Sequence, residues 1–191
     1  MSGDLILASA SPRRLDLLQS FGLSFEVEPA DIDETPKPDE SGVAVIRRVA
    51  LEKARTVAQR RPEASVLGCD TGVVLDQALL GKPQSASQAR QMLSALSGRS
   101  HEVVSAVALV RPDESVLEAV CVTTVWLASL PADWIDRYVE SKDPMDKAGG
   151  YAIQNQAGLF VSRIEGSYTN VVGLPLYETG QLLRRAGLWH P

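Results

Sequence analysis

Apolar residues near the start of the chain follow the pattern of a strand, a tight turn and a helix. The run 5–8 is continuously apolar and is followed by a turn at 9–12. From Arg13 to Phe21, leucines and a phenylalanine recur at helical spacing. Ser11 stands at the N-cap position before Pro12, and a proline there lacks only an N–H that the helix would not use. The pattern predicts a strand that turns sharply into a helix.

Longer periodic segments occupy the middle of the chain. After a polar loop at 31–40, apolar residues in the segment 43–61 form one stripe and predict a long helix. The segment 65–75 is rich in Val and Leu and predicts a buried strand. Two further β-like runs at 101–110 and 116–127 are joined by a short polar turn, so they predict a long hairpin.

The other predicted elements are shorter. Strands are expected at 25–27, 79–80 and 159–164, and helices at 87–96, 131–140 and 175–186. Strands and helices intermix without a strict βαβ rhythm, and the hairpin demands antiparallel pairing. We therefore predict an α/β fold in which helices flank a mixed, twisted sheet, with a cleft between two lobes, in a single domain over residues 1–191.

Composition narrows the possible functional classes. The chain has 191 residues, of which 45% are hydrophobic, and this suits one domain of ordinary size. Its formal net charge of −5 argues against nucleic-acid binding, because such proteins need a basic face. No apolar run approaches the roughly 18–20 residues that cross a bilayer, and the start lacks the basic flank and apolar core of a signal peptide. We expect a cytoplasmic protein with no membrane partner.

Cysteine and histidine are too sparse to indicate a disulfide framework or a zinc site. Cys69 and Cys121 lie inside apolar β-like runs, so we expect buried free thiols. His101 and His190 are far apart in the sequence and lack cysteine neighbours, which argues against zinc. Because the net charge is −5, such an acidic protein must concentrate its cations in one place to bind a phosphate group.

The turn at 9–12, together with Arg13 and Arg14, is the first candidate for chemistry. A strand that turns into a helix directs free N–H groups and the positive helix end at one spot, which favours anions. Two arginines in the first turn oppose the helix dipole at a cost of about 0.3–1 kcal/mol each. A bound polyphosphate would reverse that cost through paired hydrogen bonds to guanidinium. The alternative is a solvated arginine pair beside an ordinary cap.

Asp70 is the second candidate, because it interrupts an otherwise apolar predicted strand. A carboxylate there is costly unless it pairs, binds a metal or emerges at the strand end, where ligand clefts usually lie. The alternative is an aspartate that caps a nearby turn. Four other charged residues, taken alone, are more simply surface residues: Glu34, Lys53, Lys82 and Lys147. The sequence has neither a Walker loop nor a G-x-G-x-x-G motif, which counts against kinase-like and dinucleotide-binding functions.

Taken together, these segments resemble the Maf family of nucleoside triphosphate pyrophosphatases over almost the whole chain. The matching segments are Leu7-Ala8-Ser9-Ala10-Ser11-Pro12-Arg13-Arg14, Ile32-Asp33-Glu34, Glu52-Lys53-Ala54, Gly68-Cys69-Asp70-Thr71, Gly81-Lys82-Pro83, Ser97-Gly98-Arg99-Ser100-His101 and Asp146-Lys147-Ala148-Gly149-Gly150-Tyr151-Ala152-Ile153-Gln154. The resemblance implies a fold like that of the Maf and inosine triphosphate pyrophosphatase proteins. It also implies hydrolysis of a nucleoside triphosphate to the monophosphate and pyrophosphate, and a homodimer.

The resemblance further implies a role for each matching residue. Asp70 would accept the proton of the attacking water and, with Glu34, hold a divalent cation, either Mg²⁺ or Mn²⁺. The residues around the triphosphate would be Ser9, Arg13, Arg14, Lys53 and Lys82. Three residues match the positions with which the family sets substrate preference: Arg13, Thr71 and Gln154.

The last matching segment resembles the branch of the family that acts on dTTP and UTP, and the implied activity extends to modified pyrimidine nucleotides. One alternative is a 7-methyl-GTP pyrophosphatase, and another is a nucleotide-sensing regulator of cell division that binds without turnover. The Gln154 amide offers a donor and an acceptor that could match the O4 and N3–H edge of uracil or thymine. Cytosine presents the reversed pattern and an amide can flip. Rejection of cytosine therefore needs a second contact that fixes the amide.

Overall fold

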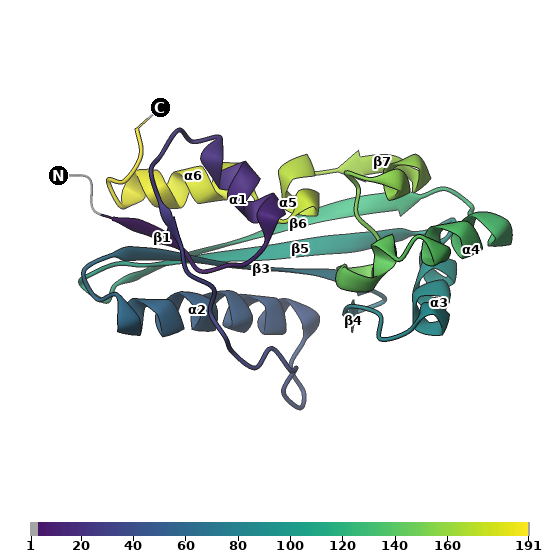
Figure 1. The fold of residues 1–191 in the computed structure, drawn as a ribbon, viewed down its shortest axis with the longest axis horizontal. Coiled ribbons are helices and arrows are strands. Elements are labelled where there is room, and N and C mark those ends of the chain that lie inside the picture. The colour runs from purple at the N-terminus through teal and green to yellow at the C-terminus, as the bar shows by residue number, and fades with distance from the viewer. Residues whose placement is uncertain (1–3, 191) are drawn as a thin grey trace.

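The computed structural model describes residues 4–190, and a mixed seven-stranded sheet forms its centre (Figure 1). The strands are β1 (Leu5–Leu7), β2 (Glu26–Val27), β3 (Ser65–Leu75), β4 (Ala78–Leu80), β5 (Ser100–Val110), β6 (Val116–Leu127) and β7 (Val161–Glu165). Their order is β2-β1-β3-β5-β6-β7, and β4 pairs with β3 outside this path. β1 is parallel to β2 and β3, whereas the remaining pairs are antiparallel. The predicted mixed α/β sheet is confirmed.

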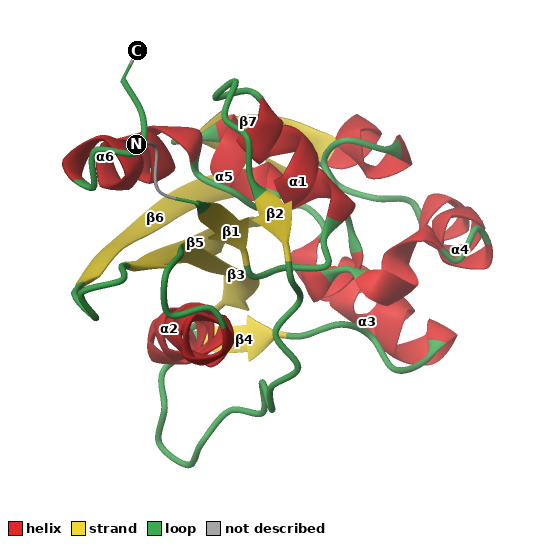
Figure 2. Cartoon of the chain, turned by 60° about the vertical axis from the view of Figure 1, so that its left-hand side comes forward, coloured by secondary structure: helices red, strands yellow, loops and turns green. Residues whose placement is uncertain are grey.

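Helices cover both faces of the sheet. They are α1 (Pro12–Gln19), α2 (Gly42–Arg60), α3 (Ala86–Leu96), α4 (Ala132–Glu140), α5 (Tyr168–Val172) and α6 (Leu176–Arg185), with short 3₁₀ helices η1 (Asp143–Asp146), η2 (Ala148–Gly150) and η3 (Gln156–Phe160). Figure 2 shows α2 on one side of the strands and α1, α5 and α6 on the other. Within residues 4–190, no helix combines the length and the apolar character needed to cross a membrane.

Hydrophobic clusters lie toward both ends of the long strands. One cluster joins β3, β5 and β6 to α3 and α4, and Leu93, Leu96 and Val125 are fully buried in it. A second cluster joins β1 and the other end of β3 and β5 to α1 and α6, with Leu18 and Leu183 at its centre. Burial of these apolar side chains is the main favourable contribution to folding. The long strands β3 and β5 carry both clusters, so residues in the middle of these strands lie between two packed regions.

A glycine allows α2 to lie very close to β3. A Cβ atom added at Gly68 would lie 2.2 Å from the carbonyl oxygen of Ala50 and 2.8 Å from the nitrogen of Ala54. Real Cβ atoms do not approach backbone atoms so closely, so glycine is required here. The close contact brings the helix residue Lys53 over the strand, near Asp70.

Several local predictions need correction. The predicted strand 159–164 is wrong in its first part, because Leu159 and Phe160 belong to η3 and β7 begins only at Val161. Helix α5 was not predicted, since its five residues are too few to show helical periodicity. Ser11 occupies the N-cap position of α1 but makes no side-chain capping bond; instead, its N–H donates to Ser9 Oγ at 3.2 Å.

Candidate active site

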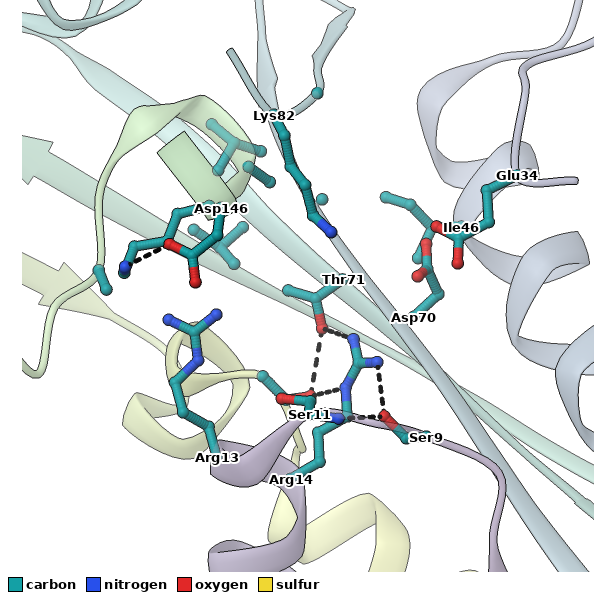
Figure 3. Close-up of a pocket in the computed structure, with 18 of the residues that line it drawn as sticks. Ser9, Ser11, Arg13, Arg14, Glu34, Ile46, Asp70, Thr71, Lys82 and Asp146 are labelled. Carbon is teal, nitrogen blue, oxygen red and sulfur yellow. Dashed lines mark hydrogen bonds and ion pairs between the residues drawn. The ribbon is translucent and has the colours of Figure 1, made fainter. Parts of the chain in front are cut away.

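A cleft of about 970 Å³ runs beside the middle of β3. Its walls come from the turn between β1 and α1, the loop between β2 and α2, helix α2, and the segments after β4 and η1 (Figure 3). All of the predicted site residues line it: Ser9, Arg13, Arg14, Glu34, Lys53, Asp70, Thr71, Lys82 and Gln154. The fold therefore gathers segments that are far apart in the sequence into one site.

Lys53 joins two acidic side chains in this cleft. Its Nζ lies 2.9 Å from Asp70 Oδ1 and 2.8 Å from Glu34 Oε1. The side chains of Lys53 and Asp70 are only 9% and 15% exposed, so this pair is largely removed from water, whereas Glu34 is about half exposed. Buried charges are tolerated when they are paired and hydrogen-bonded. One ammonium here faces two carboxylates, which leaves a net negative charge that can accept a further cation.

The positions of Asp70 and Lys53 in the fold exclude the simpler interpretations that the sequence left open for them. Asp70 lies in the middle of β3 rather than at its end, so its interpretation as a turn cap is wrong. The interpretation of Lys53 as a surface lysine is also wrong, because α2 buries it against the sheet. Among residues 4–190, no group donates a hydrogen bond to Asp70 Oδ2. That oxygen is therefore available to accept a hydrogen bond from a bound molecule.

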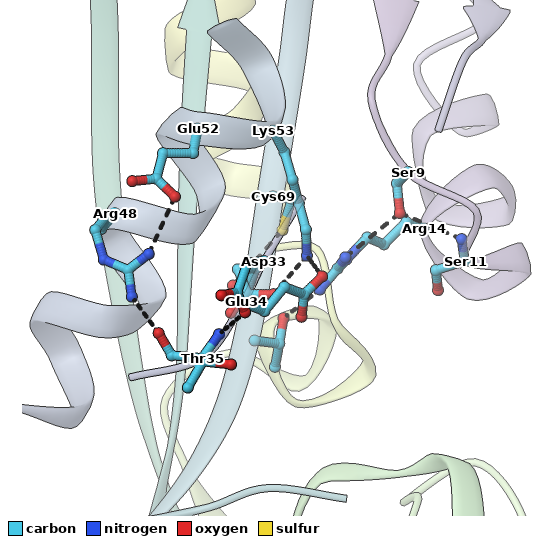
Figure 4. A network of polar contacts seen from close by, with 12 residues as sticks. Ser9, Ser11, Arg14, Asp33, Glu34, Thr35, Arg48, Glu52, Lys53 and Cys69 are labelled. Atoms are coloured by element: carbon cyan, nitrogen blue, oxygen red, sulfur yellow. Dashed lines mark hydrogen bonds and ion pairs between the residues drawn. The ribbon is translucent and has the colours of Figure 1, made fainter. Parts of the chain in front are cut away.

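Arg48 attaches the loop that carries Glu34 to α2 (Figure 4). Its guanidinium donates to both carboxylate oxygens of Glu40, at 2.8 and 2.9 Å, and to the carbonyl oxygen of Thr35 at 3.1 Å. A further bond of 3.0 Å reaches Glu52, next to Lys53. The hydrogen bonds from Arg48 hold the pKa of Glu40 at about 2. Sequence reasoning missed Arg48, because one arginine on a helix gives no signal of its loop partner.

The Arg14 side chain is hydrogen-bonded to protein groups in the wall of the cleft. Its Nε donates to the carbonyl oxygen of Gly173 at 3.0 Å. Its Nη1 and Nη2 approach Ser9 Oγ at 3.4 Å and Thr71 Oγ1 at 3.2 Å (Figure 3). The Thr71 hydroxyl also lies 2.8 Å from Ser105 Oγ, so it is well supplied with protein partners. Arg14 thus links the turn after β1 to β3 and fixes Ser9 and Thr71.

Arg13 and Lys82 are the cations of the cleft whose side chains make neither an ion pair nor a hydrogen bond among residues 4–190, whereas Arg14 is hydrogen-bonded to neutral groups. Figure 3 shows Arg13 opposite Asp146, and Lys82 extended toward the space above Thr71. Asp146 is itself bonded to Lys147 at 2.6 Å. Local cations in an acidic chain are what a phosphate-handling protein needs, because bound phosphate must be neutralised within the site. The local concentration of cations that was expected from the sequence is present.

Gln154 also lines the cleft, and the chain on either side of it is held by hydrogen bonds. Its side chain is exposed and makes no hydrogen bond to any other residue of the described chain. Nearby Tyr151 is buried, and its hydroxyl lies 2.6 Å from His101 Nε2 on β5. Burial lowers the pKa of His101 to about 4, so the ring is neutral at ordinary pH. The structure therefore anchors the backbone beside Gln154 but leaves its amide free to flip.

Lys147 does not take part in the cleft as a free cation. It is buried, and its Nζ bonds to the carbonyl and side-chain oxygens of Asp143, at 2.6 and 3.2 Å, and to Asp146. The interpretation of Lys147 as a surface residue is wrong. Instead, the hydrogen bonds of Lys147 hold the start of η2 against η1.

The donor set fits a divalent cation only if the substrate supplies further ligands. No group of three or more His, Cys, Asp or Glu side chains in residues 4–190 is arranged to hold a metal. Glu34 and Asp70, however, already share one cation, the Lys53 ammonium. Mg²⁺ is commonly bound by one or two carboxylates together with substrate phosphates and water. The two carboxylates therefore fit a cation that binds together with a phosphate chain.

Known proteins resemble this chain over nearly its full length. Residues 4–186 match the family described as Maf-like protein. A relative from Myxococcus xanthus named dTTP/UTP pyrophosphatase is 51% identical over 96% of this chain and 93% of its own length. Another from Methylococcus capsulatus, with the same name, is 50% identical over 96% of this chain and 91% of its own.

A solved structure of a HAM1 protein from Coxiella burnetii has the same overall fold. It superposes with a TM-score of 0.56 over 95% of this chain and 98% of that chain, at 21% sequence identity. Identity this low supports a shared fold and nothing finer. The family match and the two relatives, in contrast, extend through every segment that lines the cleft. The chain belongs to the Maf family.

Proposed function

We propose that this protein hydrolyses dTTP and UTP, and modified pyrimidine nucleotides of the same shape, to the nucleoside monophosphate and pyrophosphate. The observation that carries the proposal is the cleft in which Asp70 and Lys53 lie with the unpaired cations Arg13 and Lys82. The names of the relatives, at about 50% identity over nearly the whole chain, support the same activity.

The reaction is an attack of water on the α-phosphorus. Water forms the new P–O bond, the bond between the α-phosphorus and the bridging oxygen breaks, and pyrophosphate leaves with the electron pair. Asp70 Oδ2 takes the proton that water loses, and Lys53 holds the other carboxylate oxygen in place at 2.9 Å. A positioned base of this kind contributes about 10²–10⁴-fold to a rate.

The cations of the cleft overcome the repulsion between the phosphates and the nucleophile. Arg13 binds phosphate oxygens through its guanidinium, and Lys82 acts as a point charge on the departing pyrophosphate. Ser9 adds a hydroxyl at the turn that Arg14 fixes. Charge that builds up on the leaving group is thus stabilised by groups that are already in position, and such preorganised charge is usually the largest contribution to catalysis.

Glu34 and Asp70 would hold a divalent cation, Mg²⁺ or Mn²⁺, once the triphosphate is bound. When bound, the ion neutralises phosphate charge and lowers the pKa of water that it coordinates. Because the protein supplies only two carboxylates, we expect chelation by EDTA to abolish pyrophosphate release, and added Mg²⁺ or Mn²⁺ to restore it.

The free thiols support our assignment to the cytoplasm. Cys69 and Cys121 are both buried and unpaired, as expected from the sequence. Burial raises the pKa of each thiol, so neither is a reactive thiolate. A chain that keeps its cysteines reduced suits a reducing compartment.

A panel of purified nucleotides tests the proposal. Pyrophosphate release is measured with dTTP, UTP, CTP, GTP, ATP and 7-methyl-GTP at equal concentration and with Mg²⁺ present. We expect dTTP and UTP to give the highest kcat/KM. Preferred release from 7-methyl-GTP would overturn the base assignment but leave the chemistry intact. Binding of nucleotides without release of pyrophosphate would overturn the proposed hydrolysis altogether.

A further inference from the structure

Asp143 is a partly buried residue beside the segment 147–155, which carries Gln154 into the cleft. Its side chain, 23% exposed, accepts hydrogen bonds from Tyr138 Oη at 2.8 Å, Asn155 Nδ2 at 3.0 Å and Lys147 Nζ at 3.2 Å. Although burial opposes its charge, these bonds hold the pKa of Asp143 below its usual range. One carboxylate thus binds both ends of the segment and attaches them to α4.

The middle of the segment has separate anchors. The N–H of Gly149 donates to the carbonyl oxygen of Gly81 at 3.0 Å, beside Lys82. Gly149 has φ +68° and packs against Val73, so only glycine fits this turn. The Tyr151 hydroxyl is held by His101. After Tyr151, the next side chain of the segment that hydrogen-bonds to another part of the described chain is that of Asn155. Asn155 directly follows Gln154.

This arrangement bears on how a pyrimidine base is selected. The Gln154 amide makes no bond within residues 4–190, so nothing there prevents the flip that would let it accept cytosine. Discrimination between uracil and cytosine then depends on how firmly the backbone at Gln154 is held. Unlike the side-chain amide, the N–H and C=O groups of a fixed backbone face the base in one orientation. The bond from Asn155 to Asp143 controls that backbone from one residue away.

We propose that Asp143 is a positioning residue that sets the preference for uracil and thymine over cytosine, by holding Asn155 and Lys147 at the two ends of the segment 147–155. The inference rests on the proposed function, since it concerns the base of the nucleotide that the cleft hydrolyses. Asp143 does not line the cleft. It acts through the segment and not through the reacting atoms.

The first test compares UTP with CTP in the variant Asp143→Asn. The ratio of kcat/KM for UTP to that for CTP should fall roughly 3- to 10-fold, the effect expected from weakening one hydrogen bond to a charged group. The loss should appear in the KM for UTP, with kcat changed little. UTP and CTP carry the same triphosphate, so any general effect of the lost charge cancels in the ratio. Asp136→Asn, which breaks an exposed ion pair to Arg90, is the matched control and should leave the ratio unchanged.

A second variant separates positioning from folding. Asn155 lines the cleft, and the variant Asn155→Ala removes its hydrogen bond to Asp143 while the bonds of Asp143 to Tyr138 and Lys147 remain. It should lower the same ratio without changing the unfolding temperature, and the double variant should be no worse than Asp143→Asn alone, because both changes break one connection. Hydrogen–deuterium exchange of amides 148–155, measured without nucleotide, should be faster in both variants than in the wild type.

Several results would contradict the proposed role of Asp143 in base preference. An unchanged ratio, an equal loss with UTP and CTP, or a wild type that uses both equally would overturn it. Additive effects of the two substitutions would also contradict it. A wild type that releases no pyrophosphate from any nucleotide would instead refute the proposed function. In that case the exchange measurement still shows whether Asp143 holds the segment.

Discussion

At the scale of single residues, the proposed chemistry depends on the contact between Lys53 and Asp70. Both side chains are largely buried, and removing one charge from a buried pair usually destabilises the fold, because the other charge is left unpaired. Lys53, however, also binds Glu34 at 2.8 Å. Replacement of Asp70 by its neutral isostere therefore leaves the ammonium with a partner. The catalytic contribution of Asp70 can be measured in a folded protein.

We expect Asp70→Asn to lower kcat for UTP about 10²- to 10⁴-fold, since the variant lacks the base that accepts the proton of water. Nucleotide affinity, measured without added metal ion, should change little, because Arg13 and Lys82 are untouched. Steady-state pyrophosphate release and calorimetric binding measure the two effects. Asp76→Asn serves as the control, because this exposed residue of the β3–β4 turn has Arg99 as its one ionic partner among residues 4–190. An unchanged rate in Asp70→Asn would refute the assignment.

His101 makes the stability of the fold depend on pH. It stays neutral in the folded protein down to pH about 4, whereas in the unfolded chain it takes up a proton below about pH 6.5. Proton uptake by the unfolded chain alone favours unfolding. The contribution of His101 to stability is therefore complete above pH 6.5 and is lost as the pH falls toward 4.

We expect this loss to amount to about 3 kcal/mol in the free energy of unfolding. Urea unfolding of the wild type and His101→Gln at several pH values between 7 and 4 measures it. The variant should be less stable at pH 7, because Tyr151 loses its imidazole partner, but its stability should fall less steeply with acid. Carboxylates that protonate in this range affect both proteins alike. Parallel curves would contradict the account.

At the scale of elements, periodicity predicted the long segments and missed the short ones. The strand 65–75 and the hairpin 101–127 are observed nearly as predicted, because buried Val and Leu runs leave few alternatives. Helix α5 and the 3₁₀ helices have three to five residues each, which is too short for a period to show. Their conformations follow from tertiary bonds, such as that of Lys147 to Asp143, which a local pattern does not contain.

The packing of α2 on β3 gives a prediction at this scale. Gly68→Ala should destabilise the protein by at least about 2 kcal/mol, because its Cβ would meet the backbone of α2 at 2.2 Å. Gly81→Ala is the control, since a Cβ there meets nothing within 4 Å, and it should change stability by less than about 1 kcal/mol. Urea unfolding measures both. Equal stability of the two variants would show that α2 can move away from the strand.

At the scale of the whole molecule, the sequence singled out residues that line one cleft, but it did not predict how they are arranged. The motifs named the residues, and the cleft contains all of them. The pairing of Lys53 with Asp70 depends on how α2 packs along β3, and a local sequence pattern contains no information on that packing. In the same way, the partners of Arg14, among them Gly173 near the other end of the chain, come from tertiary structure alone. Nothing in the sequence indicated Arg48 or Asp143, because each contacts a loop that carries a cleft residue and the partner in that loop is known only from the fold.

The central claim is that water attacks the innermost phosphorus of a triphosphate in this cleft. Hydrolysis of UTP in ¹⁸O-labelled water, with mass spectrometry of the products, tests it most directly. The account predicts ¹⁸O in UMP and unlabelled pyrophosphate. Label in pyrophosphate, or the formation of UDP and phosphate, would contradict it.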